Sequence, residues 1–128
     1  MKNSAINTNV ENMDERTMEI IVQNIAAVYR KCQAAIQSRH THADETEISY
    51  EARYIDTVDR MLACCEKHTR LIIRKSYLET DEKQWFRQYF SEGTYRREKR
   101  KALKEFVGMV DYLKTVSKQR AAAAALTR

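Results

Sequence analysis

The near absence of helix-breaking residues limits what this chain can fold into. Its 128 residues contain no proline and only two glycines, Gly93 and Gly108. Proline and glycine interrupt helices and supply most tight turns, so the chain lacks the usual stops between short strands. The helix-favouring residues Glu, Lys, Arg, Ala, Gln and Leu are abundant. We therefore expect an all-α fold, either one compact domain or a small domain with a long helical arm.

Apolar spacing predicts three helices before residue 80. A long amphipathic helix is expected from about Met13 to Gln37, and a second, capped by Thr46 or Ser49, from there to about Lys67. A third is expected over 70–78, unless it continues the second as one bent helix. The apolar stripe of the first helix consists of Met18, Ile21, Val22, Ile25, Tyr29, Cys32 and Ile36.

A further helix is predicted to begin at about Glu92, because Ser91 is a good N-cap residue. Its apolar face recurs at three- and four-residue steps and is expected to face a core. That face comprises Tyr95, the stem of Lys99, Ala102, Leu103, Phe106, Met109, Val110 and Leu113.

Most basic residues of this helix fall off its apolar face. Between Ser91 and Lys104 there are six Lys or Arg against two Glu, a local net charge of +4. Such a face is either solvated or contacts an anionic partner. The second reading gains weight from the preceding segment, Asp81–Phe90, which we expect to be a short aromatic helix capped by Asp81. Two short helices joined by a tight turn are typical of a helix-turn-helix.

In a helix-turn-helix the second helix enters the major groove of DNA, with its N-terminal side chains nearest the bases. Arginine suits bidentate contacts to bases or phosphates, and lysine neutralises phosphates. Arg74 and Lys75 are expected to flank the same surface. The candidate DNA-binding residues are Glu92, Thr94, Arg96, Arg97, Lys99, Arg100, Lys101 and Lys104.

Charge divides the chain into two unlike halves. Residues 1–66 carry 7 basic and 11 acidic residues, a net charge of −4, whereas residues 67–128 carry 16 and 7, a net charge of +9. The second half is therefore the one suited to a polyanion. The acidic N-terminal helices are poor DNA ligands, so we expect them to supply a homodimer interface or a contact to RNA polymerase.

Several classes of function lack their sequence signals. No apolar run approaches the length of a membrane span, and the polar first residues do not form a secretory signal, so we expect no membrane association and an intracellular protein. Neither a nucleophile with a plausible base nor a Gly-rich phosphate loop is present, so no enzymatic activity and no cofactor are expected. The cysteines Cys32, Cys64 and Cys65 are interpreted as small core residues. A zinc site built from Cys64, Cys65 and His68 lacks the usual paired spacing, so no metal is expected.

The run from Leu71 to Phe106 resembles the C-terminal part of the ArpU and RinA group of phage late-gene transcriptional regulators. In that group, a helix ending in a tyrosine–leucine pair precedes a sigma-region-4-like helix-turn-helix. The matching residues are Tyr77, Leu78, Ser91, Thr94, Tyr95, Arg96, Lys99, Ala102, Leu103 and Phe106. The chain departs from the group at Trp85 and Phe86, and at Tyr89 and Phe90. The resemblance implies a phage or prophage regulator of late genes, acting in the cytoplasm of the bacterial host.

We therefore expect a transcriptional regulator that binds double-stranded DNA sequence-specifically. Two alternatives stay open: a packaging protein resembling a small terminase subunit, and a helical adaptor or inhibitor that binds an acidic protein surface. The expected organisation is a mobile arm at 1–12, an N-terminal helical region at 13–67, a helix-turn-helix region at 68–116 and a tail at 117–128. The tail is rich in alanine and either extends the last helix or is not native to the chain.

Overall fold

The computed structural model describes residues 8–39, 49–79 and 82–126, and within these ranges the chain forms helices and no strand. The expected all-α fold is thus confirmed. The elements in order are α1 (Thr8–Glu11), α2 (Glu15–Arg39), α3 (Tyr50–Ala63), α4 (Lys67–Ile73), a π-helix (Arg74–Leu78), a 3₁₀ helix (Trp85–Gln88) and α5 (Glu92–Leu126).

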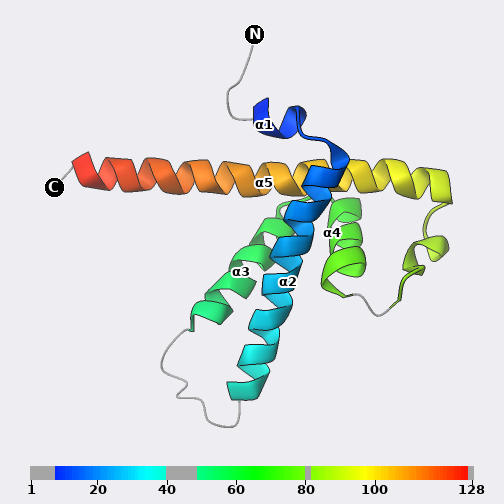
Figure 1. The fold of residues 1–128 in the computed structure, drawn as a ribbon, viewed down its shortest axis with the longest axis horizontal. Coiled ribbons are helices and arrows are strands. Elements are labelled where there is room, and N and C mark those ends of the chain that lie inside the picture. The colour runs from blue at the N-terminus through cyan, green and yellow to red at the C-terminus, as the bar shows by residue number, and fades with distance from the viewer. Residues whose placement is uncertain (1–7, 40–48, 80–81, 127–128) are drawn as a thin grey trace.

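The long helix α5 organises the molecule. Figure 1 shows α5 along the longest axis, with α2 crossing it, α3 antiparallel to α2 and ending against α5, and α4 packed against α5 nearer its start. The short α1 lies on the opposite side of α5 from α3 and α4. None of the helices, as far as the structure describes them, is long and apolar enough to cross a membrane.

The main core forms where α2 and α3 meet the middle of α5. Its most deeply buried side chains include Val22 of α2, Leu62 of α3 and Phe106 of α5, each no more than 1% exposed. The predicted long helix over 13–37 corresponds closely to α2, and Asp14 caps it by accepting a hydrogen bond from Thr17 N at 2.8 Å. Ser49 caps α3 in the same way, through Ala52 N at 3.0 Å. Thr46, the other proposed cap, lies outside the described residues.

The break between the second and third helices falls earlier than expected. α3 ends at Ala63 and α4 begins at Lys67, so they are two helices. Contacts to other residues hold this break: Glu66 N donates to the carboxylate of Glu105 at 3.2 Å, and Arg70 donates to the Cys65 carbonyl at 2.6 Å. After α4 the chain stays helical but widens into a π-turn, in which Glu79 N donates to the Arg74 carbonyl.

The predicted helix over Asp81–Phe90 is not formed. Residues 85–88 make one 3₁₀ turn, Glu82 is not helical, and Asp81, the proposed cap, lies outside the described residues. Aromatic residues have only moderate helix propensity, and the packing of Trp85 and Phe86 described below outweighs it. The structure therefore lacks the regular first helix expected of a helix-turn-helix. A short helical turn still precedes α5, in the place where that helix was expected.

The two ends of the described chain are both helical. Within the predicted mobile arm, Thr8–Glu11 is helical and Val10 is 5% exposed against the main core, so these residues pack on the fold in the structure. Residues 1–7 lie outside the described residues. At the other end α5 continues through most of the predicted tail to Leu126, so the tail extends the last helix.

Candidate nucleic-acid interface

A side-chain cap fixes the start of α5. The Ser91 hydroxyl accepts a hydrogen bond from Thr94 N at 3.2 Å, as predicted for an N-cap. It also donates to Thr94 Oγ1 at 2.9 Å, and Arg97 donates to the same oxygen at 3.3 Å. Gly93 therefore lies inside the first turn of α5 rather than in the preceding turn, and its φ is not positive. The predicted site residue Thr94 is thus occupied in stabilising this turn.

An aromatic cluster holds the first turns of α5 against α4 and the π-helix. Phe86 and Tyr95 stack with ring centroids 4.1 Å apart and planes 7° from parallel. Trp85 is 4% exposed, and its Nε1 donates to Ser76 Oγ at 3.2 Å. The hydroxyls of Ser76 and Tyr95 are 2.8 Å apart. We define the aromatic cluster as Trp85, Phe86, Tyr89, Phe90 and Tyr95.

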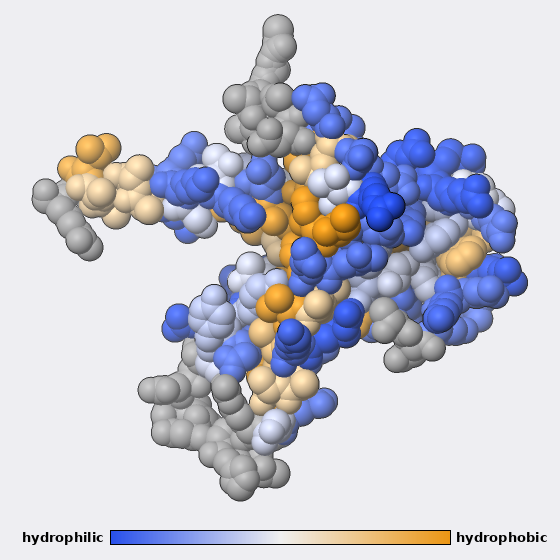
Figure 2. All heavy atoms as spheres, in the orientation of Figure 1, coloured by the Kyte–Doolittle hydropathy of each residue, from blue (hydrophilic) through white to orange (hydrophobic). Residues whose placement is uncertain are grey.

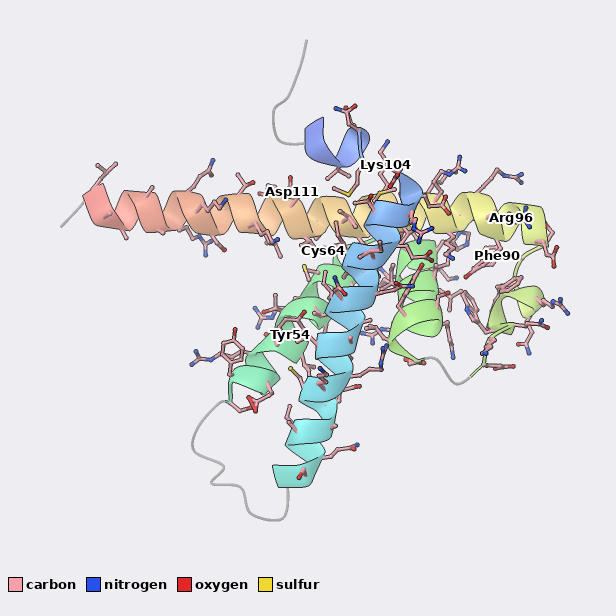
Figure 3. The ribbon with its side chains drawn as sticks, in the orientation of Figure 1. Tyr54, Cys64, Phe90, Arg96, Lys104 and Asp111 are labelled. Atoms are coloured by element: carbon pink, nitrogen blue, oxygen red, sulfur yellow. The ribbon has the colours of Figure 1, made fainter. Side chains whose placement is uncertain are left out.

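Five predicted site residues share the outward face of these turns. At about 100° per residue they occupy about 140° of the helix circumference, opposite the buried Ala102 and Phe106. All five are exposed, and Figure 3 shows that Arg96 and Lys104 both lie on this part of α5. Figure 2 shows hydrophilic residues gathered over the same end of the molecule. We call this surface the basic face: Arg96, Arg97, Arg100, Lys101 and Lys104.

Lys99 is not on the basic face. Its Nζ lies 2.9 Å from Glu19 Oε2 in α2, and the Tyr77 hydroxyl donates to the same oxygen at 2.6 Å. The hydrogen bond from Lys99, and then that from Tyr77, hold the pKa of Glu19 below its ordinary value. Burial, with the bond to Glu19, raises the pKa of Tyr77. Lys99 therefore joins α5 to α2, and its charge is largely compensated there.

Two members of the basic face have acidic neighbours but stay accessible. Arg100 Nε lies 3.0 Å from Glu15 Oε1, yet the Arg100 side chain is 76% exposed. Lys101 pairs with Glu98 at 3.4 Å. Glu92, another predicted site residue, is exposed beside Arg87, with the charged atoms 3.9 Å apart. Exposed pairs of this kind are weak, so a polyanion can replace the carboxylates as partners.

Arg74 and Lys75 do not flank the basic face as predicted. α4 packs on the side of α5 that carries Glu98 and Glu105: His68 Nδ1 lies 2.7 Å from Glu98, and Glu66 N contacts Glu105. That side is turned away from Arg96 and Arg100 by more than a third of the helix circumference. Arg74 instead pairs with Asp59 at 3.2 Å. Arg74 and Lys75 lie in a groove beside α4, described below.

The same groove contains functional candidates that the sequence analysis missed. Lys67 and Arg70 lie along it with Arg74. Their spacing of three and four residues places them on one side of a helix and could have revealed them. The missed signal was charge periodicity in a helix that had been interpreted only through its apolar residues.

The cysteines are placed in two environments. Cys32 and Cys65 are buried, as expected for core residues, whereas Cys64 is exposed, so that interpretation is wrong for Cys64. Burial raises the pKa of Cys65 to about 11, which keeps its thiol protonated near neutral pH. Within the described ranges, no group of three or more His, Cys, Asp or Glu residues is arranged to hold a metal ion.

Comparison of the chain with models of known protein families, with curated proteins and with solved structures found no match.

Proposed function

We propose that this chain binds double-stranded DNA through the basic face of α5, as a sequence-specific transcriptional regulator of a phage or prophage. The observation that carries the proposal is the placement of five exposed cations on one side of a helix whose other side is fixed in a core. A rigid helix presents its side chains at a constant spacing, which reading a base sequence requires.

The elements around the basic face support a helix-turn-helix-like mode of binding. α4, the 3₁₀ helix and α5 follow one another as the three helices of such a unit do, with the 3₁₀ turn in place of a regular second helix. α5 would enter the major groove with Arg96 and Arg97 nearest the bases. Arg100, Lys101 and Lys104 lie further along and would contact phosphates.

Gly93 also supports close approach of a partner. Glycine destabilises a helix by about 1 kcal/mol relative to alanine. The fold does not require glycine here, since an added Cβ would meet only Arg97 Nη1 at 3.9 Å, an ordinary contact distance. A glycine in the first turn leaves room for the sugar–phosphate backbone beside Arg96 and Arg97.

The biological context of the proposal comes from the resemblance of Leu71–Phe106 to the ArpU and RinA regulators. It suggests late genes as the target. A homodimer contact or an RNA polymerase contact through α2 and α3 stays a prediction, consistent with the net negative charge of residues 1–66.

The test is duplex binding read by fluorescence anisotropy, with fragments tiled across the genome that encodes the protein. We expect one fragment to be retained well above its neighbours, with log affinity falling linearly with log salt. Replacing Arg96, Arg97 and Arg100 by Ala should weaken that binding at least about 100-fold, since each good contact to a base contributes about 1–3 kcal/mol.

The matched control replaces Lys114, Lys118 and Arg120 by Ala. These three exposed cations lie on the distal part of the same helix, so the change in net charge is identical. The control should keep most of the affinity and all of the preference among fragments. Equal losses in the two triple variants would contradict the proposed site, and binding that does not distinguish fragments would contradict sequence-specific regulation.

A further inference from the structure

A groove of about 490 Å³ lies between α4 with its π-helical extension and the Tyr89–Phe90 turn. Its floor is apolar, formed by Leu71 and the two aromatic rings, and Tyr89 is 57% exposed. Figure 3 shows Phe90 on the segment that faces α4, below the start of α5. The groove thus leaves part of the aromatic cluster accessible to a partner.

The rim of the groove is positively charged. Four cations line it, Lys67, Arg70, Arg74 and Lys75, against one carboxylate, Glu79. Lys75 pairs with Glu79 at 3.6 Å, and Arg74 pairs with Asp59. Arg70 donates to a neutral carbonyl, that of Cys65. Among the described residues, neither Lys67 nor Arg70 forms an ion pair with a carboxylate, so the rim carries positive charge that is not compensated locally.

The residue types of the groove are those of a protein interface. Tyrosine and arginine are enriched among the residues that dominate binding energy, particularly where an apolar centre has a polar rim. A merely solvated basic helix would not need an exposed tyrosine and an apolar floor beside its charges. Carboxylates on a partner would complement Lys67 and Arg70, while an apolar side chain would cover Leu71 and Tyr89.

The position of the groove argues against the DNA bound by the basic face as its occupant. α4 packs on the Glu98 and Glu105 side of α5, more than a third of the helix circumference from Arg96 and Arg100, although Lys101, at the near edge of the basic face, pairs with Glu98. A duplex centred on Arg96 and Arg100 would therefore face away from the side of α5 against which α4 packs. An occupant of the groove and the duplex are therefore separate partners.

We propose that this groove is a docking site for an acidic segment of another protein that also carries large apolar side chains. The carboxylates of the segment pair with Lys67 and Arg70, and an apolar side chain seats on Leu71, Tyr89 and Phe90. The proposal does not depend on DNA binding by α5, because its residues lie on α4, the π-helix and the Tyr89–Phe90 turn.

The test uses three fluorescein-labelled synthetic peptides and anisotropy. The first alternates Asp or Glu with Leu and Phe, the second replaces Leu and Phe by Ser at the same charge, and the third replaces Asp and Glu by Lys. We expect the first peptide to bind at least about tenfold more tightly than the second, a difference of about 1.4 kcal/mol. The third should not bind, and affinity for the first should fall with added salt.

Two variants locate the binding. Lys67→Glu with Arg70→Glu should weaken the first peptide at least about tenfold, and Tyr89→Ala should do the same without any change of charge. The matched control, Lys114→Glu with Lys118→Glu, makes the same change of charge on distal α5 and should leave the affinity unchanged. Circular dichroism confirms that each variant keeps its helices. If loss of the Arg70 contact to Cys65 unfolds the double variant, Tyr89→Ala alone still tests whether the peptide binds in the groove.

Three outcomes would overturn the proposal. Equal binding of the two acidic peptides would show non-specific charge attraction, and no binding of either would leave the groove without the proposed ligand chemistry. If a short duplex displaced the first peptide, and the Lys67 and Arg70 variant lost duplex affinity, the groove would be a nucleic-acid surface. If only the proposed DNA function is wrong, the protein will not bind duplex DNA but will still bind the first peptide.

Discussion

The two halves of α5 form one continuous helix but are stabilised differently. In the first half, residues 92–110, four side chains are buried, and α1, α2, α3 and α4 all pack against the helix. In the second half, residues 111–126, no side chain is buried, Tyr112 is 51% exposed and Leu126 is 86% exposed. Figure 1 shows this half extending beyond the rest of the molecule. Tertiary packing fixes the first half. In the second half Leu113 still packs against the main core, but the alanine-rich end relies on helix propensity. The basic face lies only where the helix is fixed.

The largest expected difference between the halves is in stability. Phe106→Ala should lower the free energy of unfolding by about 3–5 kcal/mol, because it removes a buried ring from the middle of the main core. Urea unfolding followed by circular dichroism measures the effect. Tyr112→Ala, six residues along the same helix, should change stability by less than about 1 kcal/mol. Similar losses in the two variants would mean that the second half is also packed in solution.

A smaller effect is expected from the bonds that hold the first turns of α5. Ser76→Ala should cost about 1–3 kcal/mol, because it removes the acceptor of Trp85 Nε1 and the partner of the Tyr95 hydroxyl. Tryptophan fluorescence should shift to the red as water reaches Trp85. In the second half, Thr115→Ala removes only a bond from Oγ1 to the Asp111 carbonyl of the same helix and should be close to neutral. A neutral Ser76→Ala would show that stacking of Phe86 on Tyr95 suffices.

Apolar periodicity predicted most of the fold. The stripe from Met18 to Ile36 located α2, and Ser91 located the start of α5, because helix caps and amphipathic faces are local properties of the sequence. The predicted helix over Asp81–Phe90 was wrong, because the conformation of this segment is not a local property of the sequence. Its aromatic residues satisfy helical spacing, but Trp85 and Phe86 take their conformation from contacts to Ser76 and Tyr95, which are distant in sequence.

The candidate site was predictable only in part. Arg96, Arg97 and Lys104 are exposed, as their position off the apolar stripe implies. Lys99 is not available in the same way, because Glu19 and Tyr77 reach it from α2 and the π-helix. A local charge count cannot reveal a carboxylate that approaches from 80 residues earlier in the sequence.

The Lys99–Glu19 pair gives a pH-dependent test of how the first half is attached. The pKa of Glu19 is lowered in the folded protein, so its contribution to stability is present above its unfolded pKa and is lost as pH falls through the folded value. Glu19→Gln should therefore be less stable than the native protein at about pH 7, and the two should converge towards about pH 3. Because the Glu19 side chain is still 31% exposed, solvent screens the pair, and we expect a difference of no more than about 1 kcal/mol. A difference that is constant with pH would mean that the carboxylate charge does not contribute.

The smallest effect is expected at the far end of α5. A chain that ends at Ser117 loses Lys118 to Leu126, all exposed, together with residues 127–128, which lie outside the described ranges. Its free energy of unfolding should change by less than about 0.5 kcal/mol, with helical signal lost in proportion to length. A chain that ends at Met109 also loses Val110 and Leu113, which pack against the main core, and should be destabilised by several-fold more. Urea unfolding at two protein concentrations measures both. If the shorter deletion destabilised the protein, and did so more strongly at high concentration, the second half would be packed against another copy, and its exposure would belong to the isolated chain alone.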